Sequence, residues 1–187
     1  MIEITEQQLE IEDDETVVVY APYVLRNMVS RPACLESLMS VIRNIKPTIM
    51  IVLEVDANLN SSSFAIRFIE ALFLYSAFFD CVETCLKDEI TARMAFEAIL
   101  FEGIRNIVAA EGGERTVRNV GIEVWRRFFA RYGMVEIGFS ESSLYQARLV
   151  AREFASGKFS TLDANGKCLT VGWKGTPFHS ISAWRFL

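Results

Sequence analysis

Histidine, cysteine and carboxylate side chains carry much of enzyme chemistry, and this 187-residue chain offers few arrangements of them. His179 is the only histidine, so any serine or cysteine nucleophile that uses histidine as its base depends on it. It follows Pro177 by two residues, where we expect a loop between strands, and no motif surrounds the candidate nucleophiles. The sequence therefore argues against this kind of covalent catalysis, and we expect no enzymatic activity.

Two cysteine thiols are spaced for contact with each other. Cys81 and Cys85 stand four residues apart in a stretch of helical pattern, which places them on one face of a helix. A structural zinc site needs four ligands, and the chain has four cysteines without dense spacing and one histidine. We expect a pair of buried free thiols, no bound metal and no cofactor.

Two carboxylates follow an apolar run that reads as a strand. Glu54 and Asp56 come directly after residues 48–53, at the carboxyl end of a predicted parallel strand, where sites on open α/β sheets gather. One interpretation makes one of these carboxylates functional. The other makes them a hydrogen-bonding hub that organises the loop containing Asn58 and Asn60, and we favour this second interpretation.

The chain has one pair of adjacent glycines, Gly112 and Gly113. A dinucleotide or S-adenosylmethionine site needs a glycine-rich turn after a strand, so that backbone amides and a helix N-terminus meet the ligand. This pair instead follows a predicted helix. We therefore expect it to cap the end of that helix, where glycine is enriched.

The elements that must position these side chains begin with a strand, a helix and a second strand, at residues 17–20, 34–46 and 48–53. Both strand runs are almost continuously apolar, as in buried parallel strands, and the helix has apolar residues at helical spacing. Pro47 ends the helix. Such a unit predicts a parallel strand pair joined by a right-handed crossover.

The rest of the chain predicts four more helices and a strand-rich tail. Asn165 and Gly166 form a type I′ hairpin signal, so we expect an antiparallel tail that packs on the edge of the parallel strands. The predicted fold class is α/β: a partial Rossmann-like sheet with flanking helices and an antiparallel C-terminal hairpin. The predicted helices are residues 64–86, 89–110, 119–132 and 142–155, and the predicted strands are residues 134–139, 159–162, 167–173 and 181–187.

Composition limits the classes of partner. Half of the residues are apolar, which favours a packed core over disorder. The net charge of −5 gives no overall basic bias for neutralising phosphates, so a protein or small-molecule partner is favoured over nucleic acid. The longest mostly apolar run, residues 71–79, is too short to span a bilayer, and the first residues do not read as a secretory signal.

Three tryptophan-containing segments occur in an order that resembles the SAW region of the GRAS plant transcription regulators. Upstream, residues 43–60 resemble the family's strand and acidic-asparagine loop, and residues 67–80 and 105–115 resemble the region called PFYRE. The matching SAW residues are Trp125, Gly133, Trp173, Ser182, Ala183 and Trp184. The matching residues of the PFYRE-like region are Pro47, Phe68, Tyr75, Arg105, Asn106 and Glu111.

The resemblance departs from the family pattern in two ways. Glu102 and Gly103 stand where members usually carry arginine and glutamate, and this glycine weakens a helix by about 1 kcal/mol relative to alanine. The resemblance also covers only about the C-terminal half of the family's domain. We expect residues 1–16 to be a frayed acidic lead-in, with Met1 a gene-model or alternative start, and residues 17–187 to be the C-terminal part of a GRAS domain.

The resemblance implies a methyltransferase-like Rossmann fold and a regulatory, non-catalytic role in the nucleus of a plant. Its implied partners are other transcription factors, namely GRAS proteins and zinc-finger factors, with DNA reached mainly through them and with homo- or heterodimers expected. Two alternatives stay open. One is a small-molecule-binding domain or relic methyltransferase, and the other is a truncated form that competes for partners.

A group of charged residues after the glycine pair is the candidate partner surface. Its arginines are either a solvated ion-pair surface or the polar rim of a protein-binding groove. We expect the tryptophans to be core residues, with the partner site beside them, and part of the phenylalanine-rich stretch 64–79 to be exposed as an interface or an aggregation hazard. The group consists of Glu114, Arg115, Arg118, Arg126 and Arg127.

Overall fold

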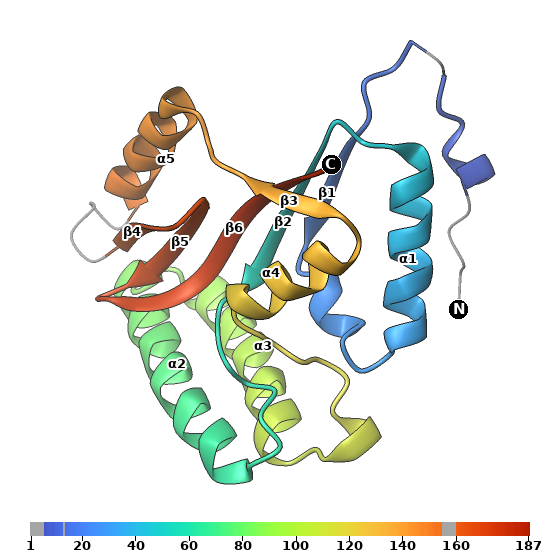
Figure 1. The fold of residues 1–187 in the computed structure, drawn as a ribbon. Coiled ribbons are helices and arrows are strands. Elements are labelled where there is room, and N and C mark those ends of the chain that lie inside the picture. Colours follow the sequence, from blue (N-terminus) through green and yellow to red (C-terminus); the bar gives the residue numbers. More distant parts are fainter. Residues whose placement is uncertain (1–5, 13, 155–159) are drawn as a thin grey trace.

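The computed structural model describes residues 6–12, 14–154 and 160–187 (Figure 1). The helices are α1 (Pro32–Ile45), α2 (Phe64–Cys85), α3 (Ile90–Val108), α4 (Ile122–Arg131) and α5 (Glu141–Glu153), with 3-10 turns η1 (Glu6–Leu9), η2 (Leu25–Asn27) and η3 (Gly112–Glu114). The strands are β1 (Val18–Pro22), β2 (Ile49–Val55), β3 (Met134–Ile137), β4 (Ser160–Asn165), β5 (Cys168–Trp173) and β6 (Thr176–Phe186). The predicted α/β class is confirmed.

The strands form one mixed sheet in the order β1-β2-β6-β5-β4, with β3 also paired to β6. β1 and β2 are parallel and joined through α1, as the apolar runs predict. Every other pair in the described sheet is antiparallel. β6 therefore holds the sheet together, because it contacts β2, β3 and β5 along its 11 residues.

His179 lies within β6, so the expectation that it occupies a loop is wrong. The strand begins at Thr176 rather than at residue 181. Pro177 suggests a break in the sequence, but it lies opposite Gly172, beside a bulge in the register of β5 with β6. A bulge accommodates the missing N–H of a proline.

Both tail hairpins have two-residue turns. The type I′ turn lies between β5 and β6, whereas the sequence predicts it between β4 and β5. The hairpin at Asn165 is confirmed, but Gly166 has a φ of 64° while Lys167 has no positive φ. A type I′ turn needs positive φ at both central residues. Lys174 and Gly175 between β5 and β6 meet that condition, with φ values of 49° and 86°.

The ends of two helices differ from expectation. α3 ends at Val108 with Ala109 as its C-cap, so the glycine pair does not cap it; Gly112, with a φ of 54°, begins η3 instead. α4 begins at Ile122 rather than near residue 119, because the carboxylate of Asp56, directly after β2, accepts a hydrogen bond from the backbone N–H of Ile122.

Two clusters of buried side chains make up the core. The first lies between α1, α4 and the sheet and contains Met39, Met50, Trp125, Phe129 and Trp184. The second lies where α2 and α3 meet the end of the sheet and contains Leu59, Leu74, Ile107, Trp173 and Phe178. Figure 1 shows α2 and α3 side by side, away from α1.

The predicted lead-in, residues 1–16, falls partly outside the described residues, which omit residues 1–5 and 13. Within it, η1 contacts α1. The predicted end of a helix at residue 155 and start of a strand at residue 159 also lie outside the described residues. In the part of the chain that the structure describes, none of the helices has the length and apolarity needed to cross a bilayer.

Candidate functional site

The SAW-like residues are buried and divide between the two cores. Trp125 and Trp184 are each 2% exposed and both contact Phe129, at ring-centroid distances of 5.9 and 4.6 Å. Ser182 Oγ accepts a hydrogen bond from Trp184 Nε1 at 2.8 Å. Trp173 lies in the other core, where its Nε1 donates to a carboxylate on α2. These residues therefore fix the antiparallel tail to helices on both sides.

The remaining SAW-like residues shape the backbone. Gly133 follows the C-cap of α4 with a φ of 74°, and its N–H donates to Ala130, as in a glycine-terminated helix. Ala183 is buried in β6, opposite Ile51 and Ile137 on the flanking strands.

The PFYRE-like residues fasten α2 and α3 to the loops around them. Asn106 donates to Val117 O at 2.6 Å and accepts from Val117 N at 3.3 Å, which holds the loop beyond η3. Pro47 is buried directly before β2. Phe68 is 43% exposed and stacks on Phe64 at 5.9 Å.

The departure at positions 102 and 103 has a local explanation. Glu102 forms an exposed ion pair with Arg105 on the next turn of α3. A Cβ atom at Gly103 would lie 2.2 Å from the hydroxyl oxygen of Tyr75 on α2. Glycine therefore permits the close approach of α2 and α3.

A buried arginine that motif spacing did not single out joins three segments. Arg67 is 1% exposed and donates to the carbonyl oxygens of Ser61 and Ser62, at 3.0 and 3.1 Å. Its guanidinium also pairs with the carboxylate of Glu111. The sequence signal is a lone arginine within an otherwise apolar helical stretch.

The candidate partner surface divides into two separate networks, and the first is partly internal. Arg115 is 4% exposed, and it shares Asn60 Oδ1 with Arg118, each at 3.2 Å. Burial, followed by repulsion from Arg118, lowers the pKa of Arg115. Arg118 also donates to Gly112 O at 2.7 Å. Glu114, at the end of η3, is exposed. Arg115 thus supports the loop from inside.

The second network surrounds α4. Arg126 donates to Glu136 at 2.9 and 3.1 Å and to Asn165 O at 2.6 Å, which ties α4 to β3 and to the turn after β4. Hydrogen bonds to Glu136 raise the pKa of Arg126. Arg127 is exposed on the same helix.

The two carboxylates after β2 bind backbone amides. Glu54 is 1% exposed, and its Oε1 accepts from the N–H groups of Leu25 and Arg26 at 2.8 and 3.2 Å. Asp56 Oδ1 accepts from Ile122 N at 3.0 Å, at the start of α4. Both carboxylates organise backbone through hydrogen bonds, as in the interpretation that we favoured from the sequence. They hold η2 and α4, however, rather than the loop of Asn58 and Asn60. Burial raises the pKa of Glu54 to about 7.

Burial shifts the pKa values of His179 and Cys81 in opposite directions. Burial, with repulsion from Arg26, lowers the pKa of His179 to about 4. Cys81 Sγ lies 3.9 Å from Cys85 Sγ, and burial raises the pKa of Cys81 to about 12, so the thiol stays protonated. Among the residues described, no group of three or more His, Cys, Asp or Glu is placed to hold a metal ion.

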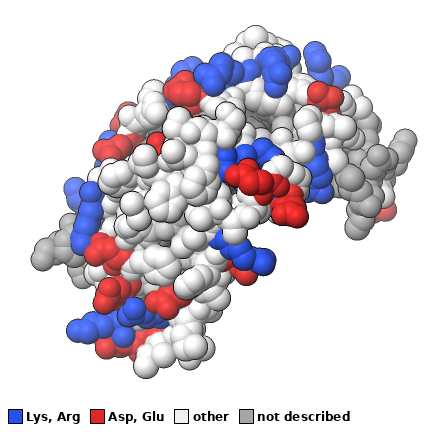
Figure 2. All heavy atoms as spheres, turned by 90° about the horizontal axis from the view of Figure 1, so that it is seen from below, with Lys and Arg blue, Asp and Glu red and all other residues white. Residues whose placement is uncertain are grey.

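The exposed sides of α2 and α3 carry an unusual number of large apolar residues. The two helices pack against each other, and Phe79 meets Phe101 edge-on at a centroid distance of 6.4 Å. Seen from below, broad areas without charged residues lie between groups of basic and acidic side chains (Figure 2). We call the α2/α3 face the set of large exposed apolar residues on these two helices that do not line the pocket described next: Phe64, Ile66, Phe68, Ile69, Leu72, Phe73, Ile90, Met94 and Phe101.

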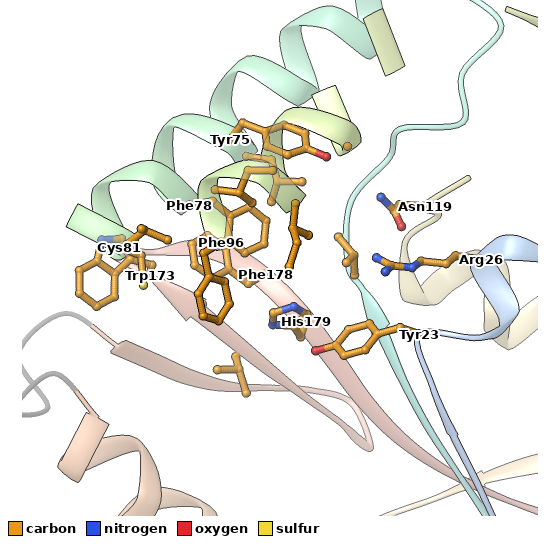
Figure 3. A pocket seen from close by; sticks show the side chains of 18 of the residues that line it. Tyr23, Arg26, Tyr75, Phe78, Cys81, Phe96, Asn119, Trp173, Phe178 and His179 are labelled. Carbon is orange, nitrogen blue, oxygen red and sulfur yellow. The ribbon is translucent and has the colours of Figure 1, made fainter. Parts of the chain in front are cut away.

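A second apolar feature is a pocket of about 1450 Å³ between α2, α3, α5 and the strands β5 and β6. Trp173, Phe178 and Phe96 line one side of it, while Arg26 and Asn119 lie on the other, with His179 between them (Figure 3). It draws residues from segments far apart in the sequence, and motif spacing gives no signal for it.

Comparison with known proteins gives one consistent result. The model of the GRAS domain family matches residues 1–185, so the match includes the acidic opening that the resemblance left out. The chain is 30% identical over 187 residues to DELLA protein GAI1 of Vitis vinifera, covering 99% of this chain and 32% of that protein. It is 31% identical over 186 residues to DELLA protein SLR1 of Oryza sativa subsp. japonica, covering 93% of this chain and 30% of that protein.

The crystal structure of SCL7 from Oryza sativa has the same fold, with a TM-score of 0.90 at 24% sequence identity. The match covers 98% of this chain and 52% of the SCL7 chain. The chain thus spans about a third of the length of the curated relatives it matches and about half of that structure.

Proposed function

The chain belongs to the GRAS domain family, and from this premise we propose that it acts in plant transcription regulation, in the nucleus, by binding other proteins. The observation that carries the proposal is the α2/α3 face. Monomeric proteins rarely leave large contiguous apolar patches exposed, and such patches mark interaction surfaces. Phe73, Met94 and Phe101 are each at least 65% exposed there.

The character of α2 supports the same proposal. Its 22 residues include few charged ones, and Arg67 among them is turned inward. A helix that is apolar around most of its circumference is stable when it is buried on more than one side. A protein partner that covers the exposed side of α2 would complete that burial.

The proposed role is non-catalytic. Burial supports this, because it lowers the pKa of His179 to about 4, which makes the imidazole a weak base, and raises the pKa of Cys81 to about 12, so that the thiol does not form a thiolate nucleophile. The net charge of −5 supports indirect contact with DNA through partners rather than direct phosphate binding.

The proposed partners are other transcription factors, of the GRAS and zinc-finger classes. Arg118 and Arg127 are candidate contacts for them, from the loop after η3 and from α4. Arg126, which is committed to Glu136 and Asn165, would position α4 for that contact.

A binding experiment with matched variants tests the proposal. The purified chain would be immobilised and exposed to a panel of GRAS and zinc-finger transcription factors, and the same panel would be applied to Phe73→Ser and Met94→Ser. We expect at least one factor to bind and each substitution to weaken binding about tenfold, because interface anchors carry most of the binding energy. The control is Tyr145→Ser on α5, where an exposed aromatic residue lies outside the α2/α3 face. Equal loss in the control, or retention in both face variants, contradicts the proposal.

A further inference from the structure

The pocket between α2, α3, α5 and the sheet is large for a chain of this size. Its volume of about 1450 Å³ exceeds the roughly 300–1,000 Å³ typical of small-molecule sites, so a ligand would occupy part of it. Most of its lining is apolar. Phe78 and Phe178 stack at a centroid distance of 3.9 Å and form its inner wall, and Trp173 and Phe96 continue the aromatic lining (Figure 3).

The opposite side of the pocket carries polar side chains that lack partners. Asn119 is only 7% exposed, and its Oδ1 accepts no hydrogen bond from the described residues. The Nε of Arg26 is likewise buried and unpaired within the described chain. Buried polar groups in folded proteins are almost always satisfied by protein or by ordered water, so each such group needs a partner that the described residues do not supply.

Two further side chains complete this polar end. Tyr23 and His179 meet edge-on at 5.3 Å, and neither makes a side-chain hydrogen bond to the residues that the structure describes. The guanidinium of Arg26 lies 5.1 Å from the centre of the Tyr23 ring. Tyr23 has a φ of 55°, a conformation that is uncommon for a bulky residue and concentrates at functional sites. The strained turn thus holds the tyrosine ring between Arg26 and His179.

We propose that this pocket binds a small molecule that has an apolar ring or chain body and an anionic head. The body lies against Phe78, Phe178 and Trp173. The head accepts charge-assisted hydrogen bonds from the Arg26 guanidinium, and a hydroxyl or acid proton on it satisfies Asn119. This assignment does not depend on the proposed partner-binding function, because it uses a different set of side chains from the α2/α3 face.

The charges around the polar end are compatible with an anion. The carboxyl of Glu54 is near Arg26. Its Oε1 is occupied by the backbone N–H groups of Leu25 and Arg26, and its buried Oε2 accepts no hydrogen bond from the Arg26 guanidinium or from any other described residue. Glu102 lines the far rim and is paired with Arg105. Arg26 therefore remains available to a ligand, since no described side chain accepts a hydrogen bond from its guanidinium.

Two fluorescent probes of nearly the same shape test the assignment. 1-Anilinonaphthalene-8-sulfonate has an apolar aromatic body and a sulfonate, and N-phenyl-1-naphthylamine has the same body without the charge. Each would be titrated against the intact chain and against Arg26→Met. We expect one site for the sulfonate, weakened about tenfold or more by Arg26→Met, while the affinity of the neutral probe changes less than about twofold.

A second variant separates ligand binding from folding. Ala147→Phe fills the pocket from α5 without removing a core side chain, so it should displace both probes. Arg43→Met removes an exposed arginine on α1 that does not line the pocket and should alter neither affinity. Circular dichroism confirms that each variant is folded. The proposal would be overturned if the sulfonate bound at several equivalent sites and neither Arg26→Met nor Ala147→Phe changed its affinity. Such binding would indicate the α2/α3 face instead of the pocket.

Discussion

At the scale of single residues, Glu54 shows how the fold sets the state of a side chain. Its carboxyl is almost fully buried, and burial raises its pKa from 4.5 to about 7 against the opposing effect of two backbone N–H bonds. Without this carboxyl, η2 would lose the acceptor for the backbone N–H groups of Leu25 and Arg26. A carboxyl that organises backbone in this way makes stability depend on pH.

We predict that the titration of Glu54 lowers the free energy of unfolding as pH rises from about 4.5 to about 7. Above pH 7 this contribution should stay constant. In this window the unfolded chain has already lost the proton that the folded chain keeps, so rising pH favours unfolding. Glu54→Gln keeps the acceptor oxygen and removes the titration, and should raise the free energy of unfolding at pH 8 by on the order of 2 kcal/mol. Urea unfolding at pH 5 and pH 8 measures both effects. Glu36→Gln, at an exposed position on α1, is the control, and an equal gain there would refute the account of Glu54.

Gly103 and Tyr75 give a second prediction at this scale. Gly103→Ala alone should destabilise the chain by about 1 kcal/mol, because the overpacking against the Tyr75 hydroxyl exceeds the gain in helix propensity. In the Tyr75→Phe background the hydroxyl is gone, and the ring carbons at 3.1 and 3.3 Å need to shift by only a few tenths of an ångström, so the same substitution should be neutral or stabilising by up to about 1 kcal/mol. Thermal unfolding of the four proteins measures the change in sign. An identical effect in both backgrounds would show that the contact does not control this position.

At the scale of elements, the hairpins of the tail determine how the tryptophans enter the two cores. β5 and β6 meet through a type I′ turn and a bulge, and Gly172 lies at that bulge. A Cβ atom there would be 2.3 Å from the carbonyl oxygen of Thr176 and 2.8 Å from Thr161 Oγ1. Because one of these atoms is backbone, the conflict cannot be relieved by rotating a side chain.

We therefore predict that Gly172→Ala destabilises the chain by about 2–4 kcal/mol, at or above the usual range for overpacking. Near-ultraviolet circular dichroism should also report a changed environment for Trp173. Gly138→Ala is the matched control, since the nearest atom to its added methyl would be Lys167 Cγ at 3.9 Å. Comparable losses in the two variants would argue against the specific clash.

At the scale of elements, some helices and strands were predictable from the sequence and others were not. The helix 34–46 and the strand 48–53 were predictable because local periodicity and apolar runs mark them, and both occur as α1 and β2. The start of β6 was missed because Pro177 suggested a break and because a lysine seldom adopts the positive φ of Lys174.

The candidate site was harder to predict, because its contacts join distant parts of the chain. Arg67 and Glu111 are 44 residues apart, and the burial of Arg115 depends on a loop that folds over Asn60. The polar end of the pocket likewise combines Tyr23 and His179, which meet only once β6 is in place. Spacing within a motif carries no information on such pairs.

At the scale of the whole molecule, the outstanding feature is the apolar α2/α3 face. Its side chains stay exposed although the two cores already contain all three tryptophans, so packing among the described residues does not explain it. The GRAS domain family to which the chain belongs includes proteins about three times as long as the matched region, such as DELLA protein GAI1 of Vitis vinifera. Covering this face is the role that we propose for a protein partner.

We predict that the isolated chain self-associates as its concentration rises, through this face. Size-exclusion chromatography with light scattering should show an increase in mean mass that Phe73→Ser combined with Met94→Ser reduces, because both residues are more than 60% exposed. Tyr145→Ser serves again as the control. A monomer at every concentration in all three proteins would show that the face does not drive association by itself.

The most direct test of partner binding through the α2/α3 face is hydrogen–deuterium exchange on the chain alone and in complex with a transcription factor that it captures. The account predicts slower exchange in residues 64–73 and 90–101, with little change in α1 on the other side of the sheet. Protection confined to α1, or to segments that include neither α2 nor α3, would contradict it.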